Sequence, residues 1–298
     1  MTLSLPTGPA RLAAIAIGLW VIQPFTSGVV IGEALDPTAD PFRTTVSVAA
    51  WALWLLILLT MAVPRPVTLT LARLGATGGL TATVWAAIEA GDQASTATLA
   101  IGVLAAIAAF AAINLPGAGD RFVDGISYGD EARFLLRAPG PVLIALLPLS
   151  AAVIVVGATA GPLLLADERW LAGSIATGLG FAAAWFPLNA VHRLTNRFVV
   201  FVPNGLVVHD KTQIREPVLF VTREIAGLAP APADTTAKDV TAAALGLALE
   251  LRLASATELP FVTGPADTEL ESVRSILISP TRPAAVMEMA LARGITIA

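Results

Sequence analysis

Long apolar segments fill the first two thirds of the chain and constrain its fold more than any other feature. The clearest, VSVAAWALWLLILLTMAV at residues 46–63, contains no charged residue. About 20 apolar residues cross the hydrocarbon core of a bilayer as a helix, because in lipid every backbone polar group must be bonded internally. Only 13% of all residues are charged, against about 25% in an average soluble protein. The sequence predicts six spans, at residues 12–33, 44–63, 71–90, 95–115, 141–165 and 170–190.

Two of the six spans are interrupted. Gln23-Pro24 and Thr26-Ser27 break the first, and Arg73 must extend toward the near interface for the third to cross. A cleaved signal peptide is the alternative for the start of the chain. We favour a span, because the apolar character continues through residues 28–32 without a small-residue cleavage site.

Arginines in the short loops indicate the orientation of the spans, because positive residues concentrate on the cytoplasmic side. With the N-terminus inside, only two arginines face outward, Arg43 and Arg169. Eight lie inside: Arg11, Arg65, Arg73, Arg121, Arg133, Arg137, Arg193 and Arg197. The sequence therefore predicts a multi-pass protein of the plasma (inner) membrane with both termini in the cytoplasm.

Residues that carry chemistry are scarce. The span interiors hold no ionisable residue, whereas transporters and channels usually keep such groups near the bilayer midplane. The chain has no cysteine, which excludes disulfides and thiolate sites. Its two histidines, His192 and His209, share no site, and His209-Asp210 lacks the G-x-S-x-G motif of a nucleophilic centre. We predict no catalytic residue, metal or cofactor, and an enzyme is the less favoured class.

Glycines spaced four residues apart occur three times in the spans, at Gly28/Gly32, Gly75/Gly79 and Gly157/Gly161. Each pair lies on one helix face and lets another helix approach closely. We interpret the pairs as contacts between spans. A seam between two copies of the chain, that is, a homo-oligomer, is the alternative.

The longest inner connection is GAGDRFVDGISYGDEARFLLRAPG, at residues 117–140. Carboxylates there could hold a divalent ion, which in turn could hold a phosphorylated lipid headgroup. The candidate residues are Asp124, Tyr128, Asp130 and Glu131. The favoured interpretation is instead an amphipathic interfacial helix from Asp130 to Arg137, whose apolar residues 134–136 dip into the bilayer.

After residue 191 the pattern changes to short apolar segments bounded by turn residues, which is typical of a β-rich soluble domain. We therefore predict a six-span membrane domain at 1–191 and a cytoplasmic domain at 192–298. The second domain opens with a β-hairpin, in which strands at 198–202 and 206–209 are joined by Asn204-Gly205. These two residues supply the positive φ angles that a tight turn needs.

Further strands are predicted at residues 218–222, 247–253 and 276–279. In LALELRL the four leucines point one way, while Glu250 and Arg252 point to water. A mobile loop is expected at 229–239. The chain then ends in a helix that begins near Pro283, is capped by Ser279 or Thr281, and closes at Arg293-Gly294.

These elements carry a resemblance. The NRFVVFVPNGLVVHD hairpin after a span, the EPVLFVTREIAGL segment, the LALELRL strand and the helix after ILISPTRP resemble bacterial pleckstrin-homology-like (PH-like) domains that follow membrane spans. The complete chain also resembles uncharacterised multi-pass membrane proteins of high-GC Gram-positive (actinobacterial-type) bacteria. The resemblance implies a curved antiparallel sheet closed at one end by the helix. It implies no single function, because that fold carries lipid binders, peptide binders and scaffolds.

Cationic residues near the predicted inner surface are candidates for binding lipid headgroups or other anions. They are Arg121, Arg133, Arg137, Arg193, Arg197, Lys211 and Arg215. The four that flank the first hairpin could form a basic rim against the anionic leaflet, worth on the order of 1 kcal/mol each. The favoured interpretation of Arg193 and Arg197 is instead that they are ordinary stop-transfer charges of the last span.

The favoured function is non-enzymatic: the cytoplasmic domain binds a protein partner or the inner membrane surface, as an assembly or regulatory subunit. Membrane lipids and one protein are the expected partners, and nucleic acid is not. The alternative is handling of a lipid or glycolipid headgroup by a flippase-like carrier or a transferase, using residues 117–140 and the juxtamembrane arginines. A small-solute transporter is the third class, and it lacks the midplane charges.

Overall fold

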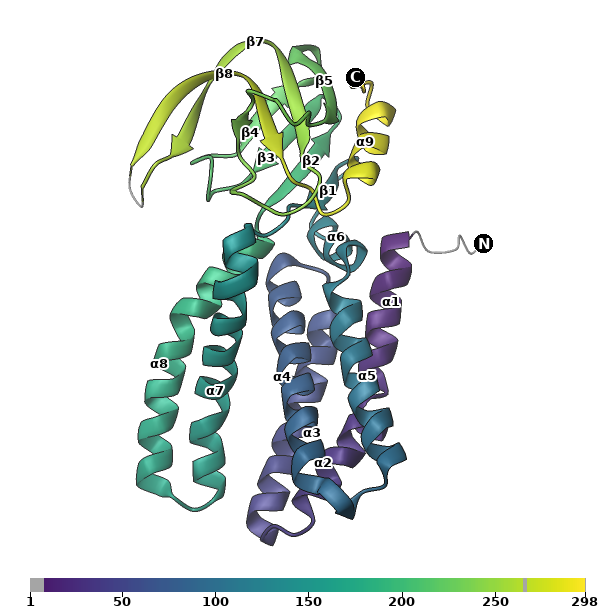
Figure 1. Cartoon of the computed structure of the whole chain (residues 1–298), viewed down its shortest axis with the longest axis vertical. Helices are drawn as coiled ribbons and strands as arrows, with labels where there is room; N and C mark the ends of the chain where they lie inside the picture. The colour runs from purple at the N-terminus through teal and green to yellow at the C-terminus, as the bar shows by residue number, and fades with distance from the viewer. Residues whose placement is uncertain (1–7, 265–266, 298) are drawn as a thin grey trace. The chain divides into compact units, whose positions relative to one another are not determined.

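A computed structural model describes residues 8–264 and 267–297 of the chain (Figure 1). It divides the protein into two compact units. The helical unit runs up to Phe122 and includes Pro148–His192, and the β unit consists of Val123–Leu147 together with the chain from Arg193 onward. The later division lies between His192 and Arg193, and residues 123–147 belong to the C-terminal unit. They do so because a strand within them completes one of its sheets.

The helical unit contains four helices that are long and apolar enough to cross a membrane: Asp40–Ala62, Thr96–Asn114, Val142–Ala166 and Trp170–Thr195. The third of these begins in the β unit, with a π-helical turn at Val142–Leu146. The helices that precede strand β2 are α1 (Gly8–Val21), α2 (Ser27–Leu35), α3 (Asp40–Ala62), α4 (Pro66–Ala90), α5 (Thr96–Asn114), α6 (Pro116–Asp124), α7 (Leu147–Ala166) and α8 (Trp170–Thr195). Four of the six predicted spans thus correspond to span-length apolar helices.

The first predicted span is broken into two helices. A 3-10 turn at Gln23–Phe25 separates α1 from α2, because Pro24 has no amide hydrogen to continue the ladder. The Gln23 side-chain amide donates to the carbonyls of Leu19 (2.8 Å) and Ala105 (3.1 Å). The Ser27 hydroxyl lies within hydrogen-bond distance of two acceptors, Gln23 Oε1 (2.6 Å) and the Gly102 carbonyl oxygen (3.0 Å). Helix α5 therefore supplies the partners that a polar break needs in an apolar setting.

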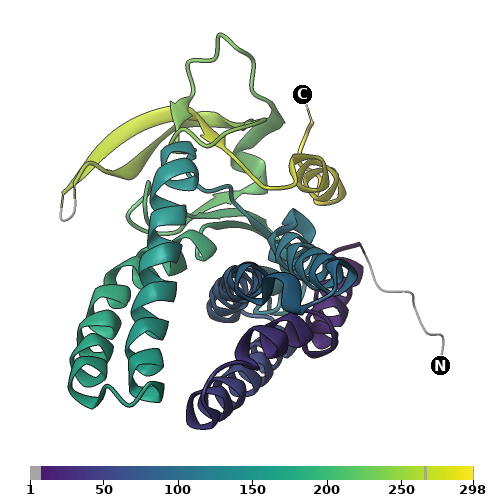
Figure 2. The same cartoon turned by 60° about the horizontal axis from the view of Figure 1, so that its bottom comes forward.

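Helices α7 and α8 run side by side as an antiparallel pair (Figures 1 and 2). A Cβ atom at Gly157 would lie 2.5 Å from the Gly180 carbonyl oxygen, and one at Gly161 would lie 2.2 Å from Thr177 Oγ1. Only glycine allows this approach, so the interpretation of Gly157/Gly161 as a helix–helix contact is confirmed. At Gly32, by contrast, a Cβ would meet nothing within 4 Å.

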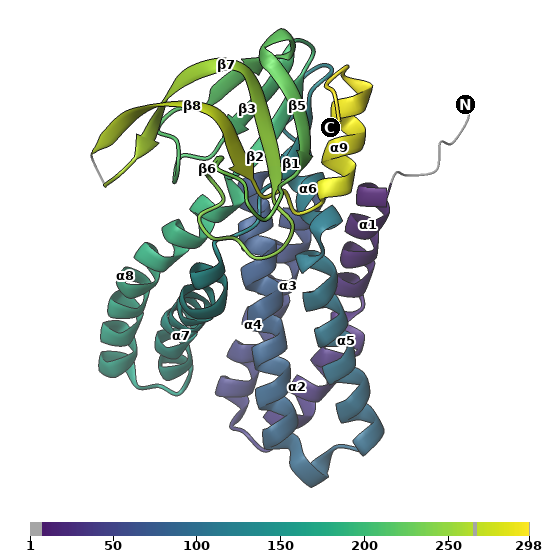
Figure 3. The same ribbon diagram turned by 45° about the horizontal axis from the view of Figure 1, so that its top comes forward.

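The β unit is built from two four-stranded sheets and one helix (Figure 3). The first sheet has the antiparallel order β1 (Ala132–Leu135), β2 (Phe198–Val202), β3 (Gly205–His209) and β4 (Val218–Val221). The second has the order β5 (Ile225–Pro230), β7 (Leu249–Val262), β8 (Thr268–Ile278) and β6 (Lys238–Asp239), with β6 parallel to β8. Both sheets and helix α9 (Pro283–Ala292) contribute to one apolar core.

Strand β1 replaces the expected interfacial helix at 130–137. Phe134 faces Val199 across the β1–β2 pair, and Phe134, Leu135 and Leu136 are buried in the β unit. The prediction that they dip into the bilayer is wrong. A short apolar run fits a strand as well as a helix, and here a strand more than 60 residues away decides between them.

The first hairpin forms, with a different turn from the predicted one. Val202 pairs with Gly205, so the two-residue loop is Pro203-Asn204. Neither Asn204 nor Gly205 has a positive φ. Proline holds φ near −65°, which suits the first central position of a type I or II turn. Gly205 is needed for a different reason, because a Cβ there would lie 2.1 Å from the Phe220 carbonyl oxygen on β4.

The second sheet and α9 confirm part of the predicted pattern. Leu249, Leu251 and Leu253 are buried as expected, whereas Leu247 is exposed and Glu250 is buried beside the Thr235 hydroxyl. The segment expected as a mobile loop contributes the end of β5 and the short β6. The predicted cap of the last helix is wrong: its N-cap is Arg282, without a side-chain cap bond.

Candidate functional site: the junction network

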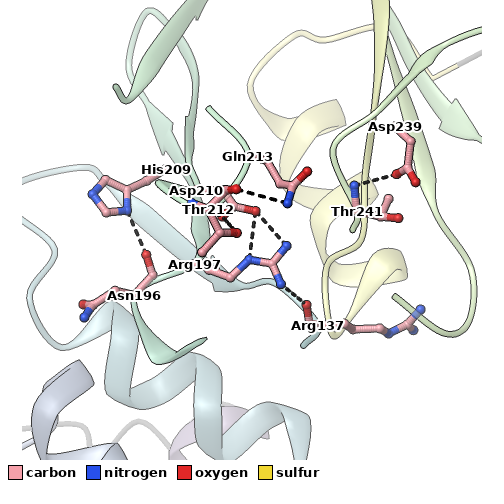
Figure 4. Close-up of polar contacts among 9 residues, drawn as sticks. All are labelled: Arg137, Asn196, Arg197, His209, Asp210, Thr212, Gln213, Asp239 and Thr241. Atoms are coloured by element: carbon pink, nitrogen blue, oxygen red, sulfur yellow. Dashed lines mark hydrogen bonds and ion pairs between the residues drawn. The ribbon is translucent and has the colours of Figure 1, made fainter. Parts of the chain in front are cut away.

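A buried ion pair lies where the chain leaves α8 and enters β2 (Figure 4). Arg197 Nε donates to Asp210 Oδ2 at 2.8 Å, and Nη2 lies 2.7 Å from the same oxygen as an ion-pair contact without hydrogen-bond alignment. Both residues are only 1% exposed. Charges are removed from water at a large cost, so such a pair persists only where further hydrogen bonds complete it.

Backbone and hydroxyl groups supply those bonds. The second oxygen of Asp210 accepts hydrogen bonds from the Thr212 amide (3.1 Å) and hydroxyl (2.6 Å). Arg197 Nη1 donates to the Arg137 carbonyl at 2.8 Å, and the Leu136 amide donates to the Arg197 carbonyl at 2.9 Å. We call Arg137, Arg197, Asp210 and Thr212 the junction network.

The network joins the two segments that lead from the β unit into its neighbouring apolar helices. Arg197 lies two residues after the end of α8, and Arg137 lies five residues before the candidate span that begins at Val142. Their contacts hold both segments in the first sheet, next to β1 and β2. The network therefore links two chain segments, residues 136–137 and 197, through hydrogen bonds in both directions.

His209 borders the network as a structural residue. Its Nδ1 lies 2.9 Å from the Asn196 carbonyl oxygen, and its ring stacks on Phe198 with centroids 4.5 Å apart. His192 belongs to the helical unit, where its Nδ1 lies 3.1 Å from Thr70 Oγ1. The two histidines are thus placed in different units, although the predicted domain at 192–298 included both.

The acidic residues of the 117–140 connection have partners of their own. Asp124 Oδ1 accepts hydrogen bonds from the Ser127 hydroxyl (2.8 Å) and the Arg133 amide (3.0 Å). Glu131 accepts from Arg133 Nη2 at 2.9 Å. Asp130 and Tyr128 are exposed, and the Asp130 carbonyl accepts from Arg293. Within residues 8–264 and 267–297, no group of three or more histidine or acidic side chains is placed to hold a metal ion.

The hydrogen bond from Arg133 lowers the pKa of Glu131. A carboxyl group with a lowered folded pKa contributes stability above its unfolded value, about 4.3, and loses that contribution as pH falls through the folded pKa. We expect Glu131→Gln to lower the denaturation midpoint slightly at neutral pH, because the pair is partly solvated. The difference between variant and parent should vanish in acid. A difference that persists unchanged well below pH 4 would contradict this assignment.

The predicted cationic residues do not gather in one place. Arg121 lies on α6 in the helical unit, and Arg197 is buried against Asp210, so neither adds to a basic rim of the β unit. Arg215 donates from Nε to the Thr268 hydroxyl. Arg137 donates to two loop carbonyls. Arg193 and Lys211 are the two exposed members.

The anion of the network was not predicted. From the sequence, Asp210 was considered only as the neighbour of His209, although Asp210 and Thr212 have the spacing of an Asx turn. That pattern marks a residue whose second oxygen remains free for another donor. Its partner, Arg197, was predicted as a stop-transfer charge or as part of a basic rim facing the inner leaflet.

Comparisons of this chain with protein-family models, with curated protein sequences and with solved structures found no match.

Proposed function

We propose that this protein is a non-enzymatic plasma-membrane protein whose cytoplasmic β unit, a PH-like domain, holds a protein partner at the inner face of the membrane. Four span-length apolar helices support the membrane location. The proposal counts six crossings, with α1 and α2 together forming the first and α4 the third. At 25 residues, α4 is long enough for a helix to span about 30 Å. The arginine distribution supports both termini inside.

The observation that carries the partner proposal is the outer edge of β8. Strand β6 pairs only with Ile276 and Leu277, at one end of β8. Along residues 268–275 the outer edge of β8 has no strand beside it in the part of the chain that the structure describes. Figure 3 shows β7 and β8 as a curved pair that extends past the other strands. An open edge offers main-chain donors and acceptors to an extended peptide, which adds as a further strand.

Side chains on this edge indicate what the peptide is. Leu270 is 68% exposed, and it stands between Glu269, which is exposed, and Glu271, which forms an ion pair with Lys238 of β6. A second copy of β8 added antiparallel around Leu270 would place the Glu269 of each copy opposite a glutamate, with no basic residue facing it, whereas opposite charges across a ladder are stabilising. The edge therefore favours a segment with an apolar residue next to a basic one that can face Glu269, over self-association.

A photo-crosslinking amino acid at position 270, in cells that natively produce the protein, tests this. We expect one protein to be crosslinked from position 270 and not from position 291 on α9, where Leu291 is equally exposed, at 66%. Glu269→Lys should reduce that product several-fold, whereas Glu288→Lys, an exposed glutamate on α9, should leave it unchanged. Equal products from both positions, or no effect of Glu269→Lys, would count against the proposal.

The contacts give less support to the alternative, lipid or glycolipid headgroup handling. Its acids Asp124 and Glu131 are engaged within their own segment, and its cation Arg197 is neutralised by Asp210. These three charges are therefore engaged within the protein.

A further inference from the structure

An apolar loop in the β unit, at residues 241–247 (TAAALGL), contains no charged residue and exposes two leucines. Leu245 is 57% exposed and Leu247 is 46% exposed. Fully burying a leucine is worth about 1.5–3 kcal/mol relative to leaving it in water. Burying these two leucines against another apolar surface would therefore be favourable.

The loop is fastened to the chain just before a membrane span. Ala244 forms a bridge with Pro139, and the Gly140 amide donates to the Ala243 carbonyl at 3.1 Å. A Cβ at Gly140 would lie 3.3 Å from Leu245 Cγ, so the leucine side chain packs against this glycine. The candidate span begins at Val142, two residues later, which is about 3 Å of helical rise. Leu245 thus lies beside the point where the chain enters the apolar segment.

Arg137 holds the loop from its polar side. Its Nη1 donates to the carbonyls of Leu245 (3.3 Å) and Leu247 (3.0 Å). The carbonyl of Arg137 in turn accepts from Arg197 in the junction network. An arginine above an apolar surface is the arrangement found where a protein meets headgroup phosphates with its apolar residues below them.

The backbone of the loop is held in an unfavourable conformation. Ala242 and Ala243 have φ angles of 56° and 57°, and Gly246 has 103°. The left-handed region costs a residue with a Cβ roughly 1–2 kcal/mol. Such strain persists where the surrounding structure imposes it, and it is typical of ligand contacts and other functional positions.

We infer that the Thr241–Leu247 loop inserts Leu245 and Leu247 into the boundary between headgroups and acyl chains of the membrane that α7 crosses. Its occupant is lipid, because the loop is tied two residues from the start of the span and is backed by a cation. The inference depends on the proposed membrane location of Val142–Ala166. It adds a lipid contact that holds the β unit close to the bilayer, separate from the β8 edge.

Single cysteines test the inference directly, since the natural chain contains none. Leu245→Cys would be labelled with an environment-sensitive fluorophore in the full-length protein, reconstituted into vesicles of phosphatidylcholine and phosphatidylserine. Lipids that carry a nitroxide near the headgroup end of the acyl chain should quench it at least several-fold more than they quench a label at Leu291→Cys. If Leu245→Cys does not fold, Leu247→Cys replaces it.

A third position separates failure of the inference from failure of the membrane assignment. Leu149 is exposed on α7, within the candidate span, and a label at Leu149→Cys should be quenched by the same lipids. Quenching at 149 with none at 245 or 247 would overturn the loop inference and leave the membrane location standing. Absence of quenching at all three positions would overturn both.

Discussion

Replacing Arg197 by alanine is expected to lower the free energy of unfolding of the β unit by about 3–5 kcal/mol. The substitution leaves Asp210, which is 1% exposed, as an uncompensated buried carboxylate. It also removes the donor to the Arg137 carbonyl, so that the segment before Val142 loses a tie to the first sheet. The loss should exceed that of any other single arginine replacement in the β unit.

Hydrogen exchange on the full-length protein in lipid nanodiscs measures this loss. Amides of β2 and β3 should exchange at least about 10²-fold faster in Arg197→Ala than in the parent protein, since 1.4 kcal/mol is a factor of ten. Arg193→Ala is the matched control, because Arg193 is exposed near the end of α8, and surface changes usually stay within about 0.5 kcal/mol. The double variant Arg197→Leu with Asp210→Leu should lose less than Arg197→Ala alone. Equal exchange in Arg197→Ala and Arg193→Ala would refute the structural role of the pair.

Replacing Gly180 by isoleucine is expected to separate α7 from α8. A Cβ at Gly180 would lie 2.2 Å from the Gly157 carbonyl oxygen, which is backbone and cannot turn aside. Overpacking of a close contact costs about 1–3 kcal/mol, and more where backbone must move. Gly178→Ile is the control on the same helix, because a Cβ at Gly178 meets nothing within 4 Å.

Tryptophan fluorescence reports this unfolding selectively. All six tryptophans lie in the helical unit, at positions 20, 51, 54, 85, 170 and 185. In a denaturing-detergent titration, Gly180→Ile should unfold at a clearly lower detergent fraction than the parent protein. Gly178→Ile should unfold at the same detergent fraction as the parent. If both variants shifted equally, the change would reflect added side-chain bulk and not a glycine contact.

Span-length helices were predictable from the sequence because their signal is local. The segments at 44–63, 95–115, 141–165 and 170–190 each contain a continuous apolar run, and each became a helix with similar bounds. The break at Gln23-Pro24 was visible as well, although its partners on α5 were not. Leu249, Leu251 and Leu253 followed from the alternation of a strand with one buried face.

Long-range pairing decided what the sequence left open. Strand β1 depends on β2, and the Arg197–Asp210 pair depends on the register of the β2–β3 hairpin. A single arginine after a span is typical of a stop-transfer charge, so nothing in its neighbours predicts burial. The exposed loop at 241–247 could not be predicted, because short apolar segments outside helices and strands show no periodicity. Its position became visible only through its contacts with Pro139, Gly140 and Arg137.

Cysteine accessibility in intact bacterial cells tests most directly whether the β unit faces the cytoplasm below a six-span membrane domain. Asp92→Cys, in the turn between α4 and α5, should react with a membrane-impermeant maleimide in intact cells. Leu291→Cys, on the exposed face of α9, should react only after the membrane is opened. Labelling of Leu291→Cys in intact cells, or protection of Asp92→Cys, would contradict the account.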